Sequence, residues 1–152
     1  MTFQFEKLTT SAQAAVANAQ TFAGGKGHAE ITPIHLLLAL LKEADGVVPA
    51  VVDKIGESRE QLTSTVESEV ERLPSSTSSS SPSVSRSLQQ VFEAAAKSAG
   101  SMSDEFVSTE HLLIALTEIE SPAKHLVHKK TSLSDSPREV LNHIELSDKT
   151  TL

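Results

Sequence analysis

Three groups of residues in this chain could in principle do chemistry: a glycine-rich loop, the histidines, and a run of acidic side chains taken together with the many serines. The loop is Gly24-Gly25-Lys26-Gly27 and superficially resembles a phosphate-binding loop. A nucleotide P-loop would need glycine where Gln20 stands and Ser or Thr where Gly27 stands, and it would follow a strand, whereas this loop follows a helical pattern. We interpret it as a helix end and turn with one exposed lysine.

The six histidines are the second group. His125 and His128 would share one face of a helix at a spacing of three residues. They do not make a zinc site, because no HExxH motif, cysteine or well-spaced carboxylate joins them. His35 and His111 differ, since they hold equivalent places near the starts of two similar helical segments. We expect these two to pack and to hydrogen-bond the helix N-terminus.

The acidic run and the many serines are the third group. Glu67, Glu69 and Glu71 are spaced by two, which scatters them around a helix and indicates a solvated face. No GxSxG motif is present, and no strand pattern could carry one. We therefore predict a non-enzymatic chain that binds no cofactor or metal. A small metal protein or hydrolase that uses His125 and His128 is the third alternative, after two binding functions described below.

The elements that would position these residues come in two copies. Residues 31–41 read ITPIHLLLALL and residues 107–117 read VSTEHLLIALT, an offset of 76 residues. The match continues upstream, where it pairs Ser11 with Ser87, Gln13 with Gln89, Ala19 with Ala95, Ala23 with Ala99 and Gly24 with Gly100. Two copies are too few for a solenoid array, so we expect the pair to close around one core.

Composition excludes several classes of protein. The chain has 152 residues, a formal net charge of −7, no Cys, no Trp, no Tyr and five Phe. Negative charge and few aromatic residues argue against nucleic-acid binding. No run of about 18 apolar residues and no export signal is seen, so neither a membrane span nor secretion is indicated. The absence of Cys fits a reducing compartment, and we predict a cytoplasmic location.

Apolar spacing predicts helix after helix. Thr9 and Ser85 are expected to cap two equivalent helices, and Thr32 and Ser108 two more, with Pro33 at a first helical position. The first helix is expected to stop at Gly24-Gly25. The patterns place helices at about residues 10–23, from 33, 47–55, 58–72, 86–100, from 109, and a poorer one near 122–129.

Two segments are expected to differ from this pattern. Residues 74–85, PSSTSSSSPSVS, have almost nothing to bury and predict a mobile linker between the halves. Near the end, Ser136-Pro137-Arg138-Glu139 is typical of a capping box and predicts a last helix reaching Ile144, with fraying beyond it.

The paired phrases, the Ala-rich helix before each and the opening Phe5-Glu6-Lys7-Leu8-Thr9 resemble the Clp N-terminal repeat domain, which precedes the ATPase rings of ClpA, ClpB and ClpC chaperones. The Ser-rich spacer is most similar to the ClpB disaggregase branch. The resemblance covers about residues 3–144. It implies an all-α fold of eight helices with pseudo-twofold symmetry and four helices per repeat. It also implies a single domain over residues 1–152, with repeat one at about 3–73, linker 74–85, repeat two at about 86–144 and tail 145–152.

The resemblance also implies a partner and a site. Such domains contact unfolded or aggregated polypeptide, or an adaptor protein. Thr9, Asp104 and Glu110 match family positions tied to that role, although they could instead cap a helix, hold a turn and satisfy a helix N-terminus. Our hypothesis is that Phe5 and Leu8 form an apolar surface and that Asp104 and Glu110 form its polar rim.

The repeat offset shows that the acidic part of this site occurs in only one of the two repeats. Asp104 corresponds to His28 and Glu110 to Ile34, so the acidic pair exists only in the second half. The resemblance further implies an isolated monomer and a hexameric parent, with ATP and Mg only in ATPase modules. No Walker motif is present, which leaves an excised domain or a free-standing adaptor or regulator as alternatives. Residues 129–134 lack the family's glycine turn, so the seventh and eighth helices fit the family pattern least well.

Overall fold

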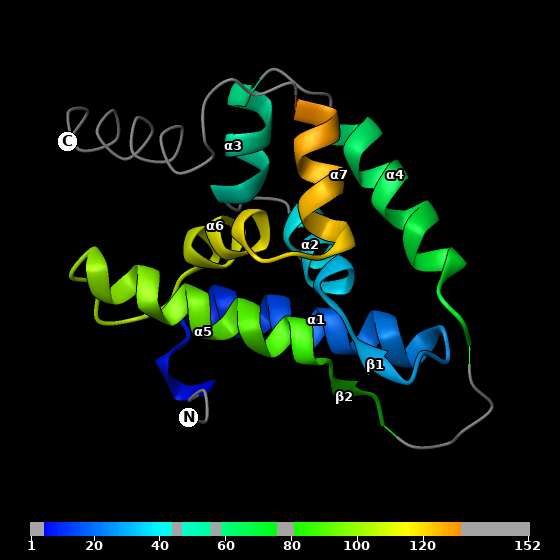
Figure 1. Cartoon of the computed structure of the whole chain (residues 1–152), viewed down its shortest axis with the longest axis horizontal. Helices are drawn as coiled ribbons and strands as arrows, with labels where there is room; N and C mark the ends of the chain where they lie inside the picture. The colour runs from blue at the N-terminus through cyan, green and yellow to red at the C-terminus, as the bar shows by residue number, and fades with distance from the viewer. Residues whose placement is uncertain (1–4, 44–46, 56–58, 76–80, 132–152) are drawn as a thin grey trace.

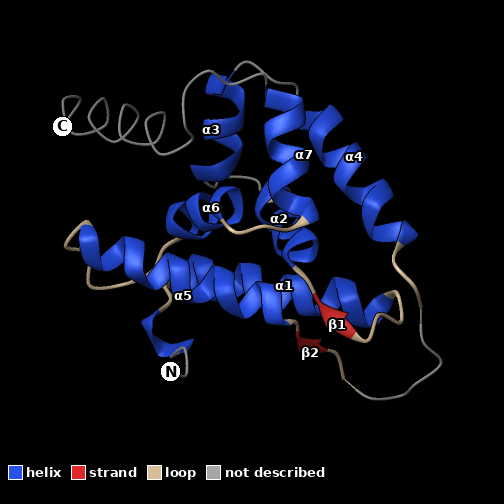
Figure 2. Cartoon of the chain, in the orientation of Figure 1, coloured by secondary structure: helices blue, strands red, loops and turns tan. Residues whose placement is uncertain are grey.

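The computed structural model describes residues 5–43, 47–55, 59–75 and 81–131, and over these residues it is mostly helical (Figures 1 and 2). This confirms the all-α prediction. The last predicted helix, from Ser136 to Ile144, lies outside the described residues. The elements in chain order are η1 (Phe5–Lys7), α1 (Thr10–Gly25), β1 (Glu30–Ile31), α2 (Pro33–Leu41), α3 (Val47–Ile55), α4 (Arg59–Arg72), β2 (Ser83–Val84), α5 (Arg86–Ser101), α6 (Thr109–Glu118) and α7 (Pro122–Thr131).

The two long helices α1 and α5 begin in the same way. The Thr9 hydroxyl accepts a hydrogen bond from the Ala12 N–H at 3.2 Å, and the Ser85 hydroxyl accepts one from the Leu88 N–H at 3.1 Å. Each bond satisfies one of the N–H groups that a helix leaves free at its N-terminus. The predicted caps are therefore confirmed, and both repeats use the same local signal.

The first helix, predicted over about residues 10–23 with its stop at Gly24-Gly25, ends two residues later than predicted. The helix includes Gly24 and Gly25 and is capped at Lys26. The chain turns at Gly27, whose φ of 72° lies in the left-handed region that favours glycine. The first two glycines can adopt helical dihedral angles, so the positive φ marks the true turn.

The centre of the molecule is formed by α2 and α6, the helices of the repeated phrase. Every residue of α2 is buried, and so is most of α6. In Figure 1, α1 and α5 run along one side of this pair, and α3, α4 and α7 lie on the other. Their apolar side chains join one continuous core that draws on both repeats, as expected for a duplication that closes on itself.

Two short parallel pairings join the repeats. Ile31 of β1 pairs with Val84 of β2, and Leu8 forms a parallel bridge with Val107. The offset of 76 residues relates Leu8 to Val84 and Ile31 to Val107. The two pairings are therefore equivalent, and in each one the segment before a long helix pairs with the segment before the central helix of the other repeat. We call them the Leu8 junction and the Val84 junction.

The second junction corrects one part of the prediction of a mobile linker over residues 74–85. Its last part is ordered, because Ser83–Val84 forms β2 and Ser85 caps α5. Ser75, at its start, donates a hydrogen bond from its hydroxyl to the Lys26 carbonyl at 3.0 Å. The strand escaped prediction because two paired residues are too few to show any periodicity. Residues 76–80 lie outside the described part.

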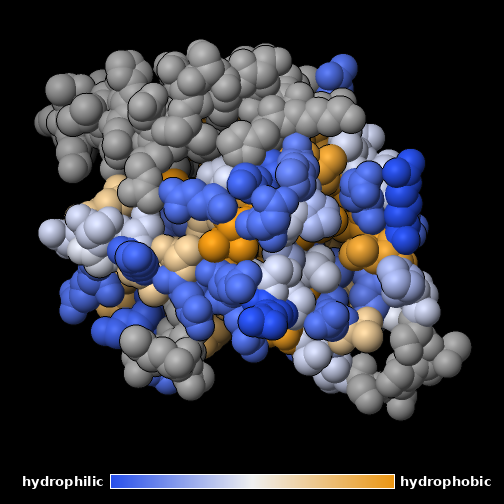
Figure 3. Space-filling model, in the orientation of Figure 1, coloured by the Kyte–Doolittle hydropathy of each residue, from blue (hydrophilic) through white to orange (hydrophobic). Residues whose placement is uncertain are grey.

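The surface of the molecule is mixed. On the face shown in Figure 3, hydrophilic residues are interspersed with small apolar areas. Among the described helices, none has both the length and the apolar character that a membrane crossing requires.

Candidate functional site

The starts of α2 and α6 are built around two histidines. The His35 ring accepts the Thr32 backbone N–H at Nδ1, at 2.9 Å, and the His111 ring accepts the Ser108 backbone N–H at Nδ1, also at 2.9 Å. Both side chains are almost completely buried. The expectation that these histidines pack and hydrogen-bond a helix N-terminus is confirmed.

The other ring nitrogen of each histidine meets a different partner. His35 Nε2 lies 2.8 Å from His28 Nδ1, whereas His111 Nε2 lies 2.9 Å from Asp104 Oδ2. Because Nδ1 of His35 and His111 already accepts a backbone N–H, we assign a proton to Nε2 of each ring, which then donates to His28 or Asp104. The correspondence of Asp104 with His28 is thus a true structural equivalence.

His35 of the first repeat is held in its neutral form. Burial, and after it the neighbouring His28, lower the pKa of His35 to about 4. At neutral pH the His35 ring therefore carries one proton, which agrees with its use of Nδ1 as a hydrogen-bond acceptor.

The Leu8 junction carries the exposed aromatic surface. Among the described residues, the large hydrophobic side chains that remain exposed are Phe5 and Phe106, each at 48%. Phe5 accepts the Leu8 N–H at its carbonyl at 3.1 Å, and Phe106 directly precedes the residue that bridges Leu8. At the Val84 junction the offset places Ser81 and Glu30 in these positions. The apolar surface therefore belongs to one junction and not to the other.

The predicted site residues are partly brought together there. Thr9 caps α1 and donates its backbone N–H to the Val107 carbonyl at 2.9 Å, which ties the start of α1 to the Leu8 junction. Glu110 lies in the first turn of α6 and is partly exposed. Leu8 is only 2% exposed, so placing it on the apolar surface was wrong: its side chain joins the core while its backbone makes the bridge.

Sequence reasoning missed Phe106. The alignment of the two repeats could have revealed it, because Phe106 corresponds to Glu30. An aromatic residue in one repeat thus stands where the other has a charged residue, at a position that does not belong to the core. A change of this kind between two copies of one fold indicates that the two surfaces have different uses.

The acidic run does not gather into a cluster. Glu67 pairs with Lys42 at 3.4 Å, Glu69 pairs with Arg72 at 3.3 Å and Glu71 pairs with Lys26. Each carboxylate thus has a different cation, as expected for side chains scattered around a helix.

The remaining candidates for chemistry were His125 and His128. His125 pairs with Glu120, and the His128 side chain lies outside the described part. Over the described residues no three His, Cys, Asp or Glu side chains gather in a way that could hold a metal ion.

Comparison with known families settles the fold family. The model of the Clp repeat (R) N-terminal domain matches residues 7–130. The chain belongs to the Clp repeat N-terminal domain family. Chaperone protein ClpB of Rhodopirellula baltica is 43% identical over 127 residues, covering 84% of this chain and 14% of that protein. Chaperone protein ClpB of Propionibacterium freudenreichii is 38% identical over 124 residues, covering 80% of this chain and 14% of that protein.

Solved structures show the same Clp N-terminal fold. The N-terminal domain of the ClpV1 ATPase from enteroaggregative E. coli superposes with a TM-score of 0.80 and 26% identity, covering 95% of this chain and 88% of that one. The Hsp104 N-terminal domain from Candida albicans gives a TM-score of 0.77 and 22% identity, covering 88% and 87%. The resemblance to Clp N-terminal domains, and to ClpB in particular, is confirmed, and this chain spans about a seventh of the ClpB proteins that it matches.

Proposed function

We propose that this Clp N-terminal domain is a non-catalytic module that binds segments of unfolded or aggregated polypeptide at the Leu8 junction, through Phe5 and Phe106. The observation that carries the proposal is the 48% exposure of both aromatic side chains at one junction, where the equivalent junction has Ser81 and Glu30. A structure with the same fold is described as a complex of the ClpV N-domain with a VipB peptide, which supports peptide binding as the mode of action.

The chemistry of this surface suits a partner without a fixed sequence. Apolar contact is non-directional, so it accepts many side chains. Burying the exposed half of each phenylalanine would contribute about 1 kcal/mol. Two such contacts give weak, reversible binding, which suits a module that captures a chain and then releases it to the ATPase ring of a longer, cytoplasmic AAA+ chaperone.

The polar residues of the junction take supporting roles in this proposal. Thr9 positions η1 by its backbone bond to Val107 and by capping α1. The Asp104 side chain is 47% exposed and also accepts a hydrogen bond from His111, so one of its oxygens is fixed. With Glu110 it forms an acidic rim that orients a partner and adds little to the affinity, because solvent and salt screen exposed charges.

The test is fluorescence anisotropy with a labelled, permanently unfolded polypeptide such as reduced carboxymethylated α-lactalbumin. The intact chain should bind saturably, and the double variant Phe5→Ala/Phe106→Ala should weaken binding about thirtyfold. The matched control is Ser81→Ala/Glu30→Ala, which changes the equivalent positions of the Val84 junction and should leave the affinity within a factor of two. Circular dichroism checks that the variants stay folded. Equal losses at the two junctions would contradict the proposal.

A further inference from the structure

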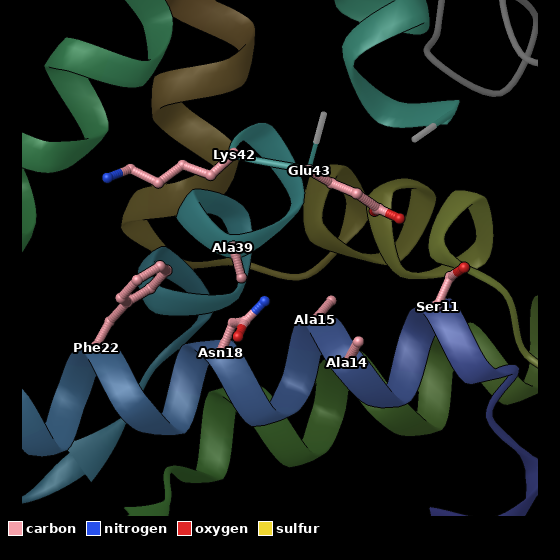
Figure 4. A pocket seen from close by; sticks show the side chains of 8 residues that line it. All are labelled: Ser11, Ala14, Ala15, Asn18, Phe22, Ala39, Lys42 and Glu43. Atoms are coloured by element: carbon pink, nitrogen blue, oxygen red, sulfur yellow. The ribbon is translucent and has the colours of Figure 1, made fainter. Parts of the chain in front are cut away.

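A groove lies between α1 and the C-terminal end of α2 (Figure 4). Its walls are α1 side chains between Ser11 and Phe22, together with Ala39, Lys42 and Glu43. Its volume of about 90 Å³ admits the end of one long side chain. Alanines form much of the α1 wall, so the groove is largely apolar, and its charge comes from the two residues that follow α2.

Glu43 is held in this groove at a cost to stability. Its Oε2 atom is buried and accepts no hydrogen bond within the described part of the chain. A buried carboxylate oxygen without a donor is destabilising. Glu43 also lies just beyond the last residue of α2, where the negative end of the helix dipole disfavours another negative charge.

The neighbouring cation is engaged elsewhere. Lys42 Nζ lies 3.4 Å from Glu67 and 5.6 Å above the centre of the Phe22 ring. In Figure 4 the Lys42 and Glu43 side chains extend in opposite directions from the end of α2. The groove therefore presents a carboxylate whose buried oxygen accepts no hydrogen bond from any donor in the described part of the chain.

The second repeat provides an internal comparison. The offset of 76 residues places Ile119 where Glu43 stands and Ser98 where Phe22 stands. Ile119 is partly buried and packs against the core, so an apolar residue satisfies this position in the same fold. The carboxylate is thus a feature of the first repeat alone, and the fold does not require it.

We propose that this groove is a second docking site, which receives a lysine or arginine side chain carried by an apolar segment of a partner polypeptide. The charge of Glu43 selects the occupant. The alkyl stem of the basic side chain would pack along Ala14 and Ala15, and its N–H groups would donate to Glu43 Oε2. The polar side chains of Ser11 and Asn18 line the same groove and would accept or donate at its edge.

The experiment titrates the ¹⁵N-labelled chain with the peptide acetyl-Ala-Leu-Arg-Leu-Ala-amide. A second peptide carries citrulline, which has nearly the shape of arginine without its charge. We expect saturable amide shifts on α1 between Ser11 and Phe22, and an affinity at least tenfold lower for the citrulline peptide. Equal affinity for both peptides, or shifts confined to the Leu8 junction, would overturn the proposal.

Two variants test whether the arginine peptide binds in this groove. Glu43→Gln should lower the affinity for the arginine peptide about tenfold and remove the preference over citrulline. Ala14→Leu places a larger side chain at an exposed position of α1, where leucine is a good helix former, and should block the groove without disturbing the core. Saturable shifts on α1 between Ser11 and Phe22 that survive both substitutions would refute the site. Phe5→Ala/Phe106→Ala should leave the shifts on α1 unchanged while removing any shifts at the Leu8 junction, so failure here and failure of the junction are distinguishable.

A further variant copies the second repeat. Glu43→Ile replaces the unsatisfied carboxylate by the residue that the fold uses at the equivalent position. We expect the Tm of the free chain to rise by about 2–4 °C while the preference for arginine over citrulline disappears. A preference that persists in Glu43→Ile would show that the carboxylate does not select the partner.

Discussion

The starts of α2 and α6 hold the same histidine with the same bond to the helix N-terminus, yet one ring faces His28 and the other faces Asp104. The bond to the backbone N–H is what each helix needs, and both copies keep it. The second ring nitrogen is not required by the helix, and there the copies differ. The comparison teaches that the duplication retained the features that specify the fold and varied the positions around them.

The largest expected effect of this difference is sensitivity of the first repeat to acid. Below its ordinary pKa of 6.5, His35 takes up a proton in the unfolded chain, whereas in the folded chain it stays neutral down to about pH 4. The unfolded state therefore binds more protons in this window, and stability falls as the pH falls from about 6.5 to about 4. The lowering of the His35 pKa from 6.5 to about 4 corresponds to a loss of about 3 kcal/mol in the free energy of unfolding.

Urea unfolding of the intact chain and of His35→Gln across pH 7 to pH 4 measures this contribution. Glutamine can accept the Thr32 N–H in a capping box and does not titrate, so the variant should lose less stability on acidification. The difference between the two curves isolates His35 from the carboxylates, which titrate in both proteins. Parallel curves would show that His35 has no part in acid sensitivity.

The next expected effect is on the same acid sensitivity, when the partner of His35 is replaced by the residue type that the second repeat has there. In His28→Asp a carboxylate replaces the ring that lies beside His35. The change removes one cause of the depressed pKa of His35 and adds a negative charge that favours the protonated ring. Because burial remains, we expect only about 1 kcal/mol of the acid-induced loss to be recovered, measured by urea unfolding near pH 4.5 relative to pH 7. A greater loss on acidification in this variant would contradict the assigned role of His28.

Effects of about the same size, and equal to each other, are expected where the copies agree. Thr9→Ala and Ser85→Ala each remove one capping bond of nearly the same length, 3.2 Å and 3.1 Å. Each should lower the free energy of unfolding by about 1 kcal/mol, and Thr9→Ser should restore the bond. Unequal losses in urea unfolding would mean that one of the two helices draws additional stability from its side-chain cap.

These equivalences explain which features were visible in the sequence. The helices were predicted well because their signals are local, as at Thr32 and Pro33, where a cap and a first-turn proline adjoin an apolar run. The two junctions were not predicted, because Leu8 and Val107 are distant in the chain and pair through backbone groups that any residue carries. The burial of Leu8 follows from that pairing, and so it was missed too.

The binding surface was only partly visible for a related reason. A single exposed aromatic residue shows no periodicity in the sequence. The proposed binding role of Phe106 depends on its place beside the Leu8 junction. Glu43 is similar, since nothing in its immediate sequence shows that one of its oxygens is buried. In both cases the equivalent residue of the other repeat, Glu30 or Ile119, provides the contrast that marks the position.

The smallest expected effect tests whether a junction binds polypeptide because of its side chains or because of its place in the fold. Ser81→Phe/Glu30→Phe gives the Val84 junction the two aromatic residues of the Leu8 junction, at positions that are both exposed. If the aromatic pair is sufficient, the unfolded polypeptide should meet two sites of similar strength, and the apparent affinity should rise about twofold. The twofold rise follows from doubling the number of sites and corresponds to about 0.4 kcal/mol in the free energy of binding. Anisotropy titration measures the affinity, and analytical ultracentrifugation of the free variant excludes self-association. An unchanged affinity would mean that the acidic rim of Asp104 and Glu110, which the Val84 junction lacks, is required as well as the aromatic pair.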